Sequence, residues 1–156
     1  MSSYLPTVIL RHKKENLRKC SLKGLETRED LVFYTYPKDT LPTLSSYVLL
    51  TLEAPLLTAS DNQYGLFLID GTWRHSEVMF KSLPKPSLFI PRSLPKELRT
   101  AYPRRQEDCS DPERGLASVE ALFAAYQLLG RDPSGLLDFY YWKNAFLEKN
   151  KLSLNL

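Results

Sequence analysis

The sequence predicts a single α/β domain over residues 1–156, with a mostly parallel sheet flanked by helices. A chain of 156 residues can bury one hydrophobic core, and its 43% hydrophobic and 25% charged residues are ordinary for a globular protein. Short, continuous apolar runs of strand length alternate with segments of helical periodicity. This alternation is typical of parallel sheets, in which ligands bind beyond the carboxyl ends of the strands.

The first third of the chain holds three apolar runs and one helical segment. Residues 7–10 predict a buried strand, and residues 15–25 suit a short helix that closes near Gly24. Residues 31–34 predict a second strand. After a loop punctuated by prolines, residues 47–52 form a continuous apolar run that predicts a third.

The middle of the chain contains the clearest buried strand, at residues 66–69. A polar turn at residues 70–72 leads from this strand into a helix expected over 73–82. Residues 87–90 predict a further strand. The irregular stretch at 91–114 carries prolines and many charges, and a loop of that length inside a compact domain is usually functional.

Two helices are expected in the last third. Apolar residues at helical spacing predict a helix over 116–129, and Gly130 follows it as a C-cap. A final helix is expected over 136–149. We interpret its aromatic cluster, residues 138–142, as core and helix packing in preference to a base-stacking platform.

Several classes of protein are disfavoured by missing motifs. The chain has no dinucleotide fingerprint, P-loop, nucleophile elbow or zinc-protease motif. Its apolar runs are far shorter than the ~20 residues of a membrane helix, and no export signal is evident, so we expect a cytoplasmic protein. Cys20 and Cys109 are expected to be free thiols. With His12 and His75 they complete no metal-ligand spacing, so no metal is expected.

Positive charge is clustered although the net charge is only +3. Such clusters beside an aromatic residue suit an RNA backbone, because Lys and Arg displace counterions and a ring can stack on a base. The alternative is a solvated face. The candidate RNA-binding residues are Arg11, Lys13, Lys14, Arg18 and Lys19, near Lys23, and Arg104 and Arg105, near Arg99 and Tyr102.

Three segments carry a family resemblance. They are LIDGTWRHSEVMF at 68–80, YPRRQ at 102–106 and GLASVEAL at 115–122. In order and spacing they resemble the DTW-domain family, named for its Asp-Thr-Trp signature. The resemblance implies a tRNA-uridine aminocarboxypropyltransferase that uses S-adenosylmethionine as donor and releases methylthioadenosine. It also implies a SPOUT-like fold with a C-terminal trefoil knot.

Two other segments resemble a sister family, the small-subunit rRNA aminocarboxypropyltransferases. They are RKCSLKGL at 18–25 and the tail LLDFYYWKNAFLEKN at 136–150. The expected partner is therefore structured RNA, with tRNA first and rRNA second, and no obligatory protein partner or membrane is indicated. The chain departs from the DTW pattern in having Ala117 at a usual hydroxyl position. It also lacks that family's early cysteine cluster, so no structural zinc is expected.

Asp70 is the candidate catalytic residue. A uracil ring N–H must lose its proton before attack, and a carboxylate at the mouth of a cleft can accept it. The alternative is that Asp70 caps the following helix. Trp73 either packs on the cofactor sulfonium or covers the core. Within the family pattern, Glu120 either holds the cofactor ammonium or fixes its loop.

The resemblance to the two families also implies which residues contact the cofactor. They are Ser21, Thr72, Trp73, Leu116, Ser118 and Glu120. Two other functions stay open, because a rotated sulfonium in the same bed would deliver a methyl group, and a non-catalytic RNA-binding or ribosome-associated module could keep the fold. The modified base is a uridine or a pseudouridine derivative.

Overall fold

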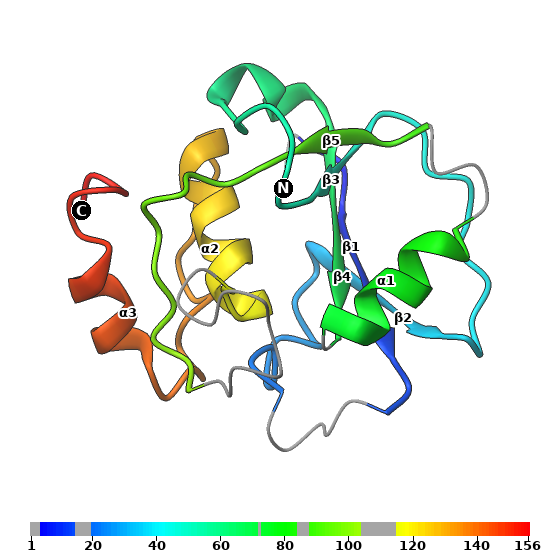
Figure 1. The fold of residues 1–156 in the computed structure, drawn as a ribbon, viewed down its shortest axis with the longest axis horizontal. Helices are drawn as coiled ribbons and strands as arrows, with labels where there is room; N and C mark the ends of the chain where they lie inside the picture. Colours follow the sequence, from blue (N-terminus) through cyan, green and yellow to red (C-terminus); the bar gives the residue numbers. More distant parts are fainter. Residues whose placement is uncertain (1–3, 15–19, 72, 84–87, 104–114) are drawn as a thin grey trace.

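Five strands form one sheet at the centre of the computed structural model (Figure 1). The structure describes residues 4–14, 20–71, 73–83, 88–103 and 115–156, except the side chains of residues 73 and 74. The strands are β1 (Thr7–His12), β2 (Leu31–Tyr36), β3 (Tyr47–Leu50), β4 (Gly65–Asp70) and β5 (Ile90–Arg92). Their order is β2-β1-β4-β3-β5, and every neighbouring pair is parallel.

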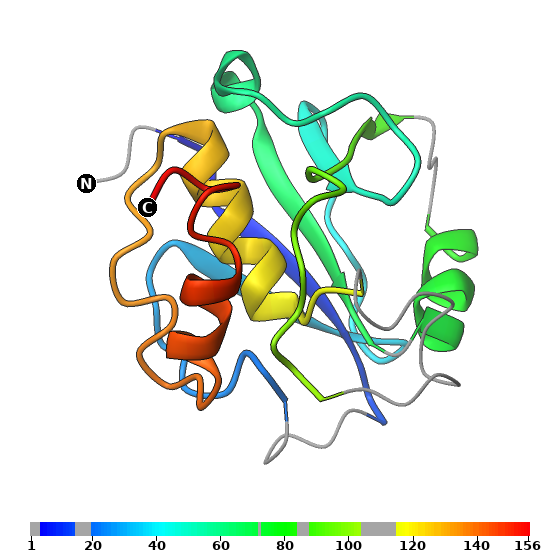
Figure 2. The same ribbon diagram turned by 60° about the vertical axis from the view of Figure 1, so that its left-hand side comes forward.

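Helices cover both faces of this sheet (Figures 1 and 2). Helix α1 (Trp73–Lys81) lies on one face, whereas α2 (Ser118–Leu129) and α3 (Lys143–Lys149) lie on the other, and a short 3-10 helix, η1 (Ala59–Gln63), precedes β4. A hydrophobic core lies on each face of the sheet, and alternate residues of β1 pack into one core or the other. Ile9 packs in the core that contains α2, and Val8 packs in the core that contains Met79 of α1. The predicted α/β fold with a parallel sheet is confirmed.

Most predicted elements are present, with shifted ends. Gly130 ends α2 with a φ of 77°, as the sequence predicts. Strand β3 ends at Leu50, before the predicted end at 52. The fifth strand was predicted to end at 90, but β5 begins at Ile90 and continues to Arg92, and residues 88 and 89 lie outside it. Strand β5 lies at the sheet edge, where Pro91 can be accommodated.

The helix predicted over 15–25 is wrong in its described part. Residues 20–25 form successive turns in which the N–H of Lys23 donates to Cys20 and that of Leu25 to Leu22. Gly24 has a φ of +91°, which ends any helical path. Leu22 and Leu25 are buried and three residues apart, a spacing that also occurs in helices. In this segment the spacing results from turns with hydrogen bonds between residues three apart.

The final predicted helix is also too long. Only Lys143–Lys149 is helical, whereas residues 136–142 form turns with backbone bonds from Asp138 to Gly135 and from Tyr140 to Leu137. The interpretation of the aromatic cluster is wrong for two of its rings. Phe139 and Tyr141 are 67% and 86% exposed, while Tyr140 is buried.

Strands β1 and β4 place the predicted site at the carboxyl edge of the sheet. They are adjacent and parallel, and their register pairs Arg11 with Asp70. Neighbouring residues in register lie side by side and project to the same face of a sheet. Arg11, near the end of β1, and Asp70, at the end of β4, therefore lie side by side at the edge where an α/β protein binds its ligands.

Candidate active site

Asp70, at the end of β4, is the centre of a buried polar cluster. Only 3% of it is exposed. Its Oδ2 accepts hydrogen bonds from Arg11 Nε and from Cys20 Sγ, each at 3.3 Å, and its Oδ1 accepts one from Ser118 Oγ at 2.5 Å. We call Asp70, Arg11, Cys20 and Ser118 the Asp70 cluster. It joins β1, β4, the turns at 20–25 and the start of α2.

Two serines, Ser118 at the beginning of α2 and Ser21 in the turns at 20–25, connect this cluster to its surroundings. Ser118 is partly exposed, as is Ser21, whose hydroxyl oxygen accepts the N–H of Val119 at 3.1 Å. A hydroxyl can accept and donate at once, so Ser21 keeps a hydrogen to donate to a ligand. Leu116, also partly exposed, lies just before the helix. Hydroxyl donors and a helix N-terminus together suit an anionic group.

Glu120 lies two residues beyond Ser118 and is completely buried. Its Oε1 accepts hydrogen bonds from Thr100 Oγ1 at 2.6 Å and the Ala117 N–H at 2.8 Å. Its Oε2 accepts from the Ala101 N–H and the Tyr140 hydroxyl, each at 2.9 Å. We call Glu120 and these four donors the Glu120 cluster. Of the two roles expected for Glu120, this geometry suits fixing the loop, because both oxygens are engaged inside the protein.

The first basic cluster of the sequence is divided by the fold. Arg11 is buried, and its guanidinium pairs with Asp70 and, at 3.3 Å, with Glu26, so it belongs to the interior rather than to a basic face. Burial acts to lower the pKa of Arg11, but Cys20 and Asp70 outweigh it and raise that pKa. Lys13 and Lys14 are exposed.

Other predicted site residues lie outside the described residues. These are Arg18, Lys19, Thr72, Arg104 and Arg105. Cys109, which is expected to be a free thiol, also lies outside the described residues. Trp73 is the first residue of α1, but its side chain is not among those described. Their roles stay predictions.

The thiol of Cys20 is free and buried against Asp70. Burial, together with the negative charge of Asp70, raises the pKa of Cys20 to about 12. The thiolate is the reactive form of cysteine. Cys20 is therefore a hydrogen-bond donor to Asp70 rather than a nucleophile.

The two histidines meet beside the carboxyl edge. The rings of His12 and His75 are stacked, with centroids 3.8 Å apart and an angle of 10° between them. His12 Nδ1 accepts the N–H of Lys14 at 3.0 Å. Burial, followed by the charges of His75, Lys14 and Lys13, lowers the pKa of His12. In the described part of the chain no group of three potential ligands is placed to hold a metal.

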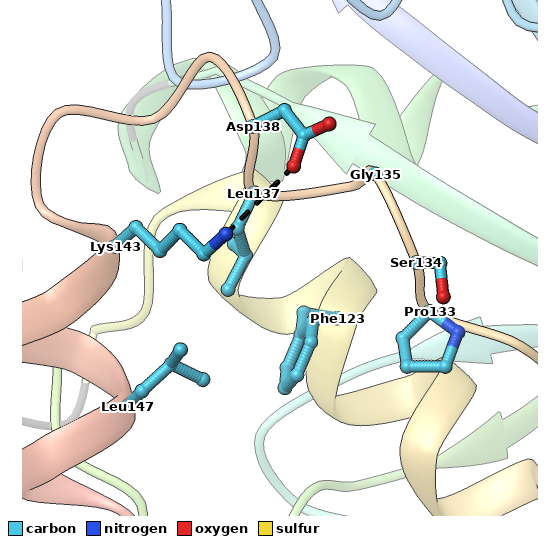
Figure 3. Close-up of a pocket in the computed structure, with 8 residues that line it drawn as sticks. All are labelled: Phe123, Pro133, Ser134, Gly135, Leu137, Asp138, Lys143 and Leu147. Atoms are coloured by element: carbon cyan, nitrogen blue, oxygen red, sulfur yellow. Dashed lines mark ion pairs between the residues drawn. The ribbon is translucent and has the colours of Figure 1, made fainter.

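A separate pocket of about 210 Å³ lies between α2 and α3 (Figure 3). Phe123, Leu137 and Leu147 contribute apolar lining, and Asp138 and Lys143 contribute charged lining. None of its lining residues was predicted as a site residue.

Within the described ranges, no helix has the length and apolar character needed to cross a membrane.

Sequence reasoning missed the partners of the two carboxylates. Arg11 and Cys20 were assigned to a basic face and to an isolated thiol, because only the β1–β4 register and the turns at 20–25 bring them to Asp70. One signal was present: Arg11 directly follows an apolar strand, at the edge where Asp70 was expected. Thr100 and Tyr140 gave no comparable signal.

Comparisons with known proteins give one informative structural match. The fold is similar to the solved structure of the SAM-dependent rRNA:acp-transferase Tsr3 from Vulcanisaeta distributa, with a TM-score of 0.73 and 23% identity. The similarity covers 97% of this chain and 82% of that one. No family model and no curated protein matches the sequence. The shared fold is established, while the resemblance to the DTW-domain family and the trefoil knot remain predictions.

Proposed function

We propose that this protein transfers a 3-amino-3-carboxypropyl group from S-adenosylmethionine to a uridine-type base in structured RNA. The observation that carries the proposal is the Asp70 cluster at the carboxyl edge of the sheet, joined to the start of α2 by the bond between Ser118 and Asp70. Support comes from the fold shared with Tsr3, an SAM-dependent rRNA:acp-transferase. The sequence motifs around Asp70 and Ser118 independently favour this chemistry.

Ser21 and the start of α2, to which its hydroxyl is bonded, fit the amino-acid end of the donor. When bound, S-adenosylmethionine supplies a carbon chain activated by its sulfonium. In our proposal, Ser21 donates its free hydroxyl hydrogen to the donor carboxylate, and the N-terminal end of α2 adds favourable dipole charge. Leu116 contributes apolar contact. Holding reactants in line can supply roughly 7–11 kcal/mol of the barrier, so these residues act by orientation.

Asp70 is proposed to accept the proton of the uracil ring N–H. Its Oδ2 is held by Arg11 and Cys20, whereas the Oδ1 bond comes from the hydroxyl of Ser118, which can rotate. A ring N–H that replaces this hydroxyl would meet a fixed acceptor. Proton transfer by a positioned carboxylate contributes about 10²–10⁴ in rate.

Exposed lysines at the end of β1 supply the proposed contact with RNA phosphates. Lys13 and Lys14 follow His12 directly and lie beside the carboxyl edge. Each phosphate contact adds about 0.7–0.9 to the slope of log affinity against log salt. Arg104 and Arg105, outside the described residues, stay proposed contacts on the strength of the sequence.

Nucleoside mass spectrometry of cells with and without the gene tests the proposal and names the RNA. Loss of one aminocarboxypropylated uridine-type nucleoside is expected. If the nucleoside disappears from small-subunit rRNA, the result would support an rRNA substrate, as the similarity to Tsr3 and the sequence of residues 136–150 suggest. If it disappears from tRNA, the result would support a tRNA substrate, as the DTW-like segments suggest. Loss of a methylated nucleoside instead would favour a methyltransferase, and an unchanged profile would contradict both enzymes.

A further inference from the structure

Two exposed aromatic rings stand out in the segment that precedes α3. Phe139 is 67% exposed and Tyr141 is 86% exposed, although Tyr140 between them is buried. Adjacent residues therefore point alternately outward and inward. Large rings held in water forgo the stabilisation of burial, so neighbouring exposed rings mark a candidate binding surface.

Contacts with neighbouring residues of the protein hold these two rings in place. The Tyr140 hydroxyl donates to the buried carboxylate of Glu120 at 2.9 Å, which anchors the middle of the segment. Trp142 packs edge-on against Tyr141, with ring centroids 4.7 Å apart at 81°. The ring of Phe139 lies over Gly24, where a Cβ would come within 2.5 Å of its Cγ. The exposed surface is consequently preorganised, which lowers the entropy lost on binding.

The same contacts connect the surface to the Asp70 cluster. Glu120, the anchor of Tyr140, lies two residues after Ser118, which bonds to Asp70. Gly24, under Phe139, belongs to the turns that also contribute Cys20 and Ser21. Phe139 therefore packs against the same turns that supply Cys20 to the Asp70 cluster.

Charge near the rings favours a polyanion. Lys143 lies directly after Trp142, and its partly exposed ammonium makes a long ion pair with the exposed carboxylate of Asp138, at 3.7 Å (Figure 3). Lys23 is exposed beside Gly24. Lysines beside stacking rings are the combination that single-stranded nucleic acids bind. A stable protein interface hides about 800 Å² on each partner, more than two rings of ~150–250 Å² each provide.

We propose that Phe139 and Tyr141 form a platform on which unpaired bases of the RNA substrate stack, with Lys143 and Lys23 facing its phosphates. That this RNA is the enzyme's substrate rests on the proposed function. The stacking itself does not, because it requires only that the protein bind single-stranded RNA.

The test is the affinity of the full-length protein for a fluorescein-labelled single-stranded RNA at several salt concentrations. Tyr141→Ala should weaken binding about 5- to 150-fold, the equivalent of ~1–3 kcal/mol for one stacked base. The salt slope should stay unchanged, because no charge is removed. Tyr141→Phe keeps the ring and should bind like the wild type. Phe80→Ala removes a ring that is 40% exposed on α1, across the sheet, and should have no effect.

Wild-type affinity in Tyr141→Ala would overturn the platform, as would an equal loss in Tyr141→Phe, which would point to the hydroxyl. An equal loss in Phe80→Ala would also overturn it. Thermal unfolding of each variant checks that the fold is intact. Methylthioadenosine release separates the two proposals: ring-dependent RNA binding without release would refute the function and leave the platform standing. Release of methylthioadenosine, together with RNA affinity that does not depend on the Tyr141 ring, would refute the platform and leave the proposed function standing.

Discussion

Asp70 and Glu120 are both buried carboxylates beside the start of α2, with 3% and 0% of their surfaces exposed, but they are held differently. Glu120 receives four bonds from neutral donors, two on each oxygen, and those donors come from the 100–101 loop, the start of α2 and Tyr140. Asp70 receives a cation and a thiol on one oxygen and a partly exposed hydroxyl on the other. The first arrangement ties segments together, whereas the second leaves an oxygen whose partner can be exchanged.

The largest effect on stability is expected from Glu120→Ala. It would leave four donors without their acceptor, and each buried unsatisfied group costs ~1–3 kcal/mol, so the free energy of unfolding should fall by more than ~3 kcal/mol. Urea denaturation followed by circular dichroism measures this loss. Glu148→Ala removes an exposed carboxylate from α3 and should change little. If Glu120→Ala were as stable as Glu148→Ala, the Glu120 cluster would not be a structural tie.

Arg11→Met should have the next largest effect, a loss of about 3 kcal/mol in the free energy of unfolding, because it leaves the Asp70 carboxylate buried without a cation. The double variant with Asp70→Asn should lose less than the sum of the two single losses. Additive losses would mean that Arg11 and Asp70 do not act as a pair.

Arg11→Met should also leave the salt slope of RNA binding unchanged, whereas Lys13→Ala with Lys14→Ala should lower that slope by about one to two units.

Strands β1 to β4 and helix α2 were predictable because each depends on a local pattern. Continuous apolar runs mark strands buried on both faces, and Gly130 marks the end of α2 through its positive φ. Residues 136–142 were not predictable in this way. Their apolar residues fit a helix, but the tertiary bond from Tyr140 to Glu120 and the contact of Phe139 with Gly24 favour turns.

The candidate site was predictable in part for the same reason. Asp70 and Ser118 stand at the ends of recognisable elements, so their positions at the sheet edge follow from the sequence. Arg11 and Cys20 become their partners only through strand register and a turn conformation, which no local pattern contains. Glu120 was recognised as important, but its saturation by buried donors depends on residues 19 and 20 positions away.

A smaller loss is expected for Ser118→Ala. The variant removes the donor to Asp70 Oδ1 and should cost about 1 kcal/mol of unfolding free energy, the usual net value of one hydrogen bond. Ser118→Thr keeps a hydroxyl and should recover most of the loss, as measured by urea denaturation. A loss as large as that of Glu120→Ala would make the two clusters structurally equivalent and contradict the distinction drawn between them.

The smallest effect concerns pH and lies outside both clusters. Because the folded state lowers the pKa of His12 below its ordinary 6.5, the unfolded chain binds a proton more readily. The contribution of His12 to the free energy of unfolding should therefore be fully present above pH ~6.5. It should decline as the pH falls from about 6.5 toward the lowered pKa of the folded state. Protonation would also remove the acceptor of the Lys14 N–H. His12→Asn should flatten urea-derived stability in this window, and an unchanged pH dependence would exclude His12 as its source.

The most direct test of the account is the release of methylthioadenosine from S-adenosylmethionine by the wild type and by Asp70→Asn, with RNA present. The wild type should release methylthioadenosine, and the variant should do so about 10²–10⁴ times more slowly while cofactor and RNA affinities stay near their wild-type values. Raising the pH should partly restore the variant, because more uracil ionises without a base. S-adenosylhomocysteine as the product, or transfer by Asp70→Asn at the wild-type rate, would contradict it.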